Sequence, residues 1–108
     1  MTRTGPTEPG TTEPVVVEFT ADGSLRLTAE VAQMFFPSDS LVAVPRGHEL
    51  WLMPLIGPEG GGLLLKQRNT RGDRSALIWE ALPPESPPVG ERTAIWDAAN
   101  GALRVSLR

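Results

Sequence analysis

Residues 94–107, which read AIWDAANGALRVSL, carry the clearest hairpin pattern in this chain. The pair Asn100-Gly101 is typical of a two-residue type I′ turn, because both residues tolerate a positive φ. The same register sets Asp97 opposite Arg104 on the polar face. It also gives the hairpin one apolar face, formed by the pairs Ala98–Leu103, Trp96–Val105 and Ala94–Leu107.

A second hairpin is predicted over residues 15–27, where a β-branched and aromatic run precedes the turn Ala21-Asp22-Gly23. A two-residue turn would mix apolar and charged side chains on each face. A three-residue loop with Gly23 at positive φ avoids this, and it pairs Phe19 with Leu25 and Val17 with Leu27.

One short helix is predicted over about residues 29–36. Thr28 is a suitable N-cap, and Glu30 places a negative charge in the first turn, where it suits the helix dipole. Pro37 ends the helix. The buried stripe is predicted from helical spacing to comprise Val31, Met34 and Phe35.

The rest of the chain alternates short apolar runs with glycine- and proline-rich turns, which predicts further strands. These strands are expected at residues 41–44, 50–53, 63–68 and 75–82, with Trp51, Trp79 and Trp96 each inside a strand. A glycine-rich segment at 56–62 and a stiff proline-rich loop at 83–88 connect them. The predicted fold is therefore mostly β, a small barrel or two packed antiparallel sheets of about eight short strands with one short helix.

The sequence predicts a tail followed by one domain. Residues 1–14 contain only Thr, Pro, Gly, Glu and Arg after the first Met, so they are predicted to form a disordered tail. Residues 15–108 are expected to form a single β-rich domain, a length that suits one domain.

Composition argues against most catalytic chemistry. The chain has no cysteine and one histidine, so thiolate chemistry, zinc fingers and sites with two imidazoles are excluded. We expect a protein that is not an enzyme and has no cofactor or metal. No apolar run approaches the ~18 residues of a membrane span, and no apolar leader segment is present. A cytoplasmic bacterial protein with no membrane contact is the expectation.

The candidate binding site is a cluster of cations. Lys66, Arg68, Arg71 and Arg74 fall within nine positions, and Asp73 is the only acid among them. On a hairpin, Lys66 and Arg68 share a face, while Arg71 and Arg74 flank the tip. The cluster is predicted to bind a phosphate, a carboxylate or an acidic partner surface. The alternative is an ordinary solvated hairpin tip or an edge strand charged against strand addition.

One third of the chain carries a family resemblance. The run GSLRLTAEV at residues 23–31, a short helix and the run DSLVAV at residues 39–44 together resemble the swapped-hairpin unit of the AbrB and MraZ transcription factors, over residues 22–53. The resemblance implies an intertwined dimer that binds DNA through basic strand residues, of which Arg26 is the one that matches. Thr28 stands where the family prefers Pro, and Ser38 stands where the turn prefers Gly.

Three functions follow from these observations. The first is a small protein-interaction domain, an accessory or assembly subunit that docks on a larger bacterial protein. The second is a DNA-binding regulator that uses Arg26, Arg46 and the cation cluster as a homodimer, although the net charge of −3 disfavours nucleic acid. The third is a β barrel that binds a small molecule with Trp51, Trp79 or Trp96. Strand order, oligomeric state and partner stay open at this level.

Overall fold

A computed structural model describes residues 13–55 and 62–108. The predicted disordered tail, apart from Glu13 and Pro14, and the glycine-rich segment, apart from Gly62, therefore lie outside the described residues. The strands are β1 (Val15–Phe19), β2 (Ser24–Leu27), β3 (Ser40–Arg46), β4 (Glu49–Pro54), β5 (Leu63–Leu64), β6 (Lys66–Gln67), β7 (Arg74–Leu77), β8 (Gly90–Asp97) and β9 (Ala102–Ser106).

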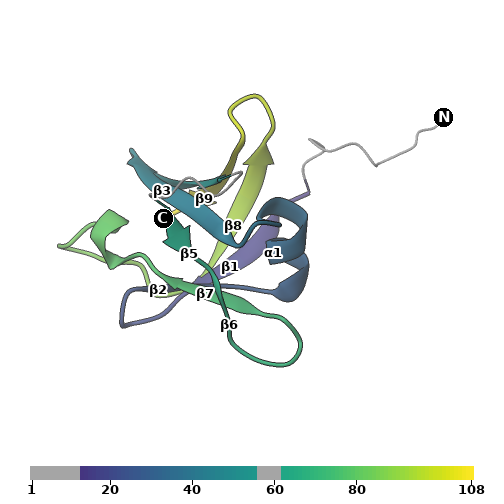
Figure 1. Cartoon of the computed structure of the whole chain (residues 1–108). Coiled ribbons are helices and arrows are strands. Elements are labelled where there is room, and N and C mark those ends of the chain that lie inside the picture. The colour runs from purple at the N-terminus through teal and green to yellow at the C-terminus, as the bar shows by residue number, and fades with distance from the viewer. Residues whose placement is uncertain (1–12, 56–61) are drawn as a thin grey trace.

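One antiparallel sheet contains all of these strands, in the order β5-β3-β4-β9-β8-β1-β2-β7-β6. Its two edge strands, β5 and β6, are separated in the chain by Leu65 alone. The predicted strand 63–68 is thus bent at Leu65, so that one half pairs with β3 and the other with β7. This bend brings the ends of the sheet together into a nearly closed barrel (Figure 1). The prediction of a mostly β fold with one short helix is confirmed.

The core lies inside the barrel, because alternate residues of each strand point inward. Most of the fully buried side chains come from strands on all sides of the sheet and fill its interior. The largest of those on strands are Phe19, Leu25, Leu27, Leu41, Leu50, Leu52, Leu103, Val17 and Val105. Phe36 and Ile78, which lie outside the strands, are buried with them.

The helix α1 (Ala29–Phe35) covers one end of the barrel (Figure 1). Thr28 caps it as predicted, since its Oγ1 accepts a hydrogen bond from the backbone N–H of Val31 at 3.2 Å. Val31 is buried as expected, but the prediction for Met34 is wrong, because this side chain is 66% exposed. A helix of two turns makes few contacts, and its last turn is held instead by Phe35, whose ring stacks on Trp96 with centroids 5.0 Å apart.

The first hairpin has the predicted register. Phe19 pairs with Leu25, and Gly23 has a φ of +87°. In the next hairpin, β3 and β4 are longer than predicted, because Pro45 and Arg46 continue the pairing with β4 rather than ending the strand.

The register predicted for the last hairpin is wrong by two residues. Trp96 pairs with Leu103, and Asp97 pairs with Ala102, so four residues form the loop. A type I′ turn needs a positive φ at both central residues, and only Gly101 has one. The Asp97 carboxylate stabilises the longer loop by accepting hydrogen bonds from the backbone and side chain of Asn100 at 3.2 and 2.9 Å. A shift of two residues keeps every side chain on its predicted face.

The predicted strand 75–82 ends early. Its partner strand β2 begins at Ser24, which pairs with Leu77, so no strand lies beside the residues beyond. The N–H of Ile78 donates instead to the carbonyl of Gly23 at 2.9 Å. The chain then forms the 3₁₀ helix η1 (Trp79–Ala81), and Trp79 lies outside the sheet.

Closure of the barrel at Leu65 predicts that substitutions of two neighbouring leucines differ in their effect on stability. Leu65 is 3% exposed and belongs to the core, whereas Leu64 is 61% exposed. Leu65→Ala is expected to lower the free energy of unfolding by about 2–5 kcal/mol, because it removes buried side-chain volume at the bend. Leu64→Ala, the matched control, should change it by less than about 0.5 kcal/mol. Urea denaturation of both variants measures the difference, and equal losses would contradict the role given to Leu65.

Candidate functional site

A row of polar side chains crosses the outer face of β2, β7 and β6, which lie side by side (Figure 1). Ser75 pairs with Arg26 on one side and with Lys66 on the other. Two strand spacings separate the cations, so their Cα atoms lie about 10 Å apart with a serine between them. Arg68 lies one residue beyond the end of β6, where its N–H still pairs with the carbonyl of Asp73, so alternation places it on the same face as Lys66. We call Arg26, Ser75, Lys66 and Arg68 the cationic row.

Lys66 and Arg68 differ from the other cations of the described residues. Within residues 13–55 and 62–108, neither side chain has an ion pair, a hydrogen bond or an aromatic contact, and both are exposed. The other cations have such contacts: Arg26 with Glu18, Arg46 with Trp51, Arg71 with Asp73, Arg74 with Asp39, Arg92 with Val89, Arg104 with Glu49 and Arg108 with His48. Lys66 on β6 and Arg68 just after it have no partner among the described residues, so their charge is available for a ligand.

The other two residues of the predicted cluster have internal partners. Arg71 pairs with Asp73 at 2.8 Å within the turn. Arg74 reaches across the barrel end, where its Nε lies 3.0 Å from Asp39, and its side chain also donates to the carbonyl of Gly72. The four predicted residues thus divide into a pair facing solvent and a pair that holds the hairpin in place.

Asp73 anchors the hairpin to the helix. One carboxylate oxygen accepts from the backbone N–H of Ala29 at 3.0 Å, and the other accepts from Asn69 at 3.0 Å and from Arg71. The hydrogen bond from Asn69, followed by those from Arg71 and Ala29, holds the pKa of the Asp73 carboxyl well below its usual range. The ionised carboxylate therefore fixes the position of Asp73. Arg68 is held in turn by the backbone of Asp73, because the N–H of Arg68 donates to the carbonyl of Asp73 at 2.7 Å.

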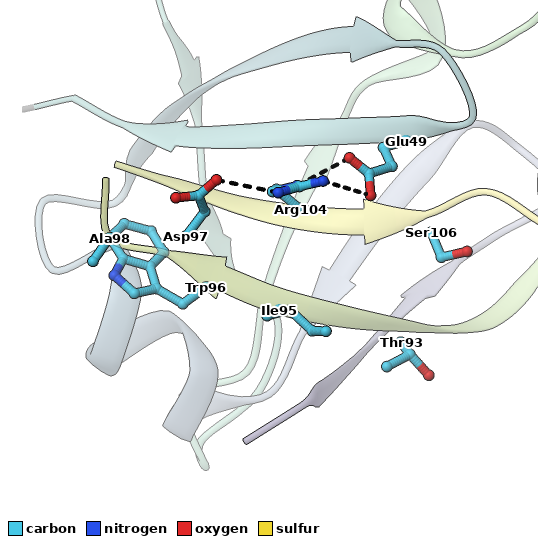
Figure 2. Close-up of a pocket in the computed structure, with 8 residues that line it drawn as sticks. All are labelled: Glu49, Thr93, Ile95, Trp96, Asp97, Ala98, Arg104 and Ser106. Atoms are coloured by element: carbon cyan, nitrogen blue, oxygen red, sulfur yellow. Dashed lines mark hydrogen bonds and ion pairs between the residues drawn. The ribbon is translucent and has the colours of Figure 1, made fainter. Parts of the chain in front are cut away.

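A second cluster of charges lies at a pocket over β4, β9 and β8, in the middle of the strand order (Figure 2). Arg104 points between two carboxylates, with nitrogens 3.0 Å from Glu49 and 3.2 Å from Asp97. It also lies over the ring of Trp51, whose Nε1 donates to Glu49 at 2.9 Å. Each of these groups contacts another member of the cluster, so we interpret the pocket as a structural network.

The pKa values in this pocket support that interpretation. Hydrogen bonds from Arg104 and then Trp51 lower the pKa of Glu49, and hydrogen bonds led by that from Asn100 lower the pKa of Asp97. Both groups are therefore carboxylates at neutral pH, without the raised pKa that a general acid needs. Glu80, the acid that follows Trp79, lies in η1, outside this pocket.

The three tryptophans do not line a common cavity inside the barrel. Trp51 lies under Arg46 and Arg104, Trp96 stacks on Phe35, and Trp79 is exposed. The described residues contain no group of three or more side chains suited to hold a metal ion. In the same part of the chain, no helix is long and apolar enough to cross a membrane.

Sequence reasoning missed the cationic row as a unit. Lys66 was identified from its neighbours in the chain, but Arg26 and Ser75 join it only through the pairings of β7 with β2 and β6. These pairings depend on strand order, which leaves no local signal in the sequence. Arg26 is also the basic strand residue that matches the AbrB and MraZ pattern.

In comparisons with known proteins, no family model, curated protein or solved structure matches this chain.

The anchoring role of Asp73 predicts a pH-dependent effect on stability. A lowered pKa in the folded state means that the carboxylate stabilises the fold above its ordinary pKa of 3.8, and that this contribution is lost as the pH falls from there. Asp73→Asn should therefore lower the melting temperature at neutral pH, and its difference from wild type should shrink below pH 3.8. Glu80→Gln removes one negative charge from an exposed side chain outside this cluster and is the control. A constant difference across this pH range would contradict the assignment.

Proposed function

We propose that this chain is a non-enzymatic protein-interaction domain, an accessory subunit that docks on an acidic surface of a larger protein in the bacterial cytoplasm. The observation that carries the proposal is the pair of cations Lys66, on β6, and Arg68, just after it, which have no partner among the described residues. They lie beside Ser75 and Arg26, of which Arg26 also pairs with Glu18, on a face that crosses three adjacent strands.

Carboxylates are the partners that fit this geometry. Guanidinium and ammonium groups donate strong hydrogen bonds to carboxylates, and a serine between them supplies a neutral donor. The turn that presents Arg68 is fixed by Asp73, so little conformational entropy is lost there on binding.

Docking through side chains also suits the fold better than strand addition. The two edge strands of the sheet have two residues each and are consecutive in the chain. A partner strand would find only a short ladder of hydrogen-bonding groups there. We therefore place the contact on the outer face rather than on the sheet edge.

Charge reversal at the row is the direct test. Lys66→Glu and Arg68→Glu are each expected to weaken capture of the partner from a native bacterial lysate, and binding of the purified partner should fall steeply as salt rises. Arg71 is unsuitable for this test, because its reversal would disturb the ion pair with Asp73. Arg108→Glu is the matched control, since it makes the same change in net charge at the C-terminal end of the chain.

Two outcomes would contradict the proposal. If both row variants retain the same partner with wild-type affinity, the cationic row is not the docking surface. If instead the wild-type protein binds duplex DNA at low salt and has the mass of a dimer in solution, the DNA-binding alternative replaces it. In that alternative Arg26, Arg46 and the predicted cation cluster contact phosphates, and the resemblance to AbrB and MraZ implies this role for Arg26.

A further inference from the structure

An apolar groove adjoins the cationic row. It has a volume of about 790 Å³ and lies where the turn between β1 and β2 meets η1 and the proline-rich loop. Its most exposed apolar side chains are Leu77, 55% exposed, and Trp79, 59% exposed. The remaining lining residues are Ala21, Asp22, Gly23, Glu80, Leu82, Pro83, Pro84 and Pro87.

The backbone at Trp79 is held in place although its side chain is exposed. A Cβ atom at Gly23 would lie 2.5 Å from the Cβ of Trp79, so the absence of a side chain at Gly23 allows the two segments to touch. The hydrogen bond from Ile78 to the carbonyl of Gly23, 2.9 Å long, fixes the same contact. An exposed tryptophan on a fixed backbone is a suitable anchor point for a protein interface, because tryptophan is enriched among the residues that contribute most of the binding energy.

The groove and the row form one continuous surface. Ser75 and Leu77 are two residues apart on β7, so they point to the same side and lie about 7 Å from each other. An extended peptide that places a carboxylate over the row would therefore bring the residue two to four positions away over Leu77 and Trp79.

The charges of the groove and of the row determine the direction in which such a peptide would lie. The groove carries two acids, Asp22 and Glu80, and none of the described residues that line it is a cation. An acidic side chain would be repelled there and attracted to Lys66 and Arg68, while an apolar side chain is accepted by the leucine, tryptophan and proline surface.

From these observations we infer that the docking surface recognises a linear peptide segment in which an acidic residue lies two to four positions from a large apolar residue. The acidic residue pairs with the cationic row, and the apolar residue packs on Leu77 and Trp79. This inference rests on the proposed function, because it uses the same row, and it adds the groove as the determinant of specificity.

A phage-displayed library of random linear peptides, selected on the purified full chain, tests the inference. The selected peptides should share an acidic and a large apolar residue at this spacing, and synthetic copies should bind Trp79→Ala about tenfold more weakly than wild type. Leu77→Ser should act in the same direction. Met34→Ala is the matched control, because Met34 is an equally exposed apolar side chain on the helix. Melting temperatures of all variants check that each one folds.

The outcomes separate the two proposals. Peptides that lose affinity for Lys66→Glu but bind Trp79→Ala as tightly as wild type would overturn the groove and leave the cationic row in place. Peptides that bind Lys66→Glu and Arg68→Glu as tightly as wild type would overturn both. Failure to select any peptide, or selection of peptides without the acidic residue, would equally overturn the inference.

Discussion

The bend at Leu65 is the constraint on which the rest of this structure depends. A single buried residue separates the half-strand that pairs with β3 from the half-strand that pairs with β7, so the chain itself joins the two ends of the sheet. The N–H of Leu65 continues the ladder by donating to the carbonyl of Asp39 at 2.8 Å, and its side chain enters the core. Without this bend, β6 would have no reason to lie beside β7 in the register that aligns Lys66, Ser75 and Arg26.

Charges on this barrel serve two different purposes. Arg74, Arg104 and Asp73 are bound to partners far away in sequence, and they fix the ends and turns of strands. Lys66 and Arg68 have no such partner among the described residues, and they lie on the face that these fixed turns present. Cations without a partner among the described residues indicate a binding surface more strongly than the number of cations in a stretch of sequence does, because that number includes cations that are engaged in ion pairs.

Local signals in the sequence predicted what local interactions determine. The Thr28 cap, the register at Phe19 and Leu25 and the mostly β character follow from capping, alternation and turn residues close in the chain. At Met34 and Trp79 a missing neighbour prevailed over local preference, whereas at the Asn100-Gly101 turn one local interaction, the hydrogen bonding of Asn100 to Asp97, prevailed over another. Half of the predicted site, Lys66 and Arg68, could be identified as exposed cations, but their alignment with Arg26 depends on strand order.

The place of the last hairpin in the sheet has a consequence for how the protein is made. β8 and β9 lie in the middle of the strand order, where they join β1 to β4. Until β8 and β9 have left the ribosome, β1, β2, β6 and β7 can pair on one side and β3, β4 and β5 on the other, without the two strands that join them in the finished sheet. The two parts then expose the apolar faces that the finished barrel buries, so a chain that stops before β9 would offer them to chaperones and proteases, and the barrel can close only once β9 has been synthesised.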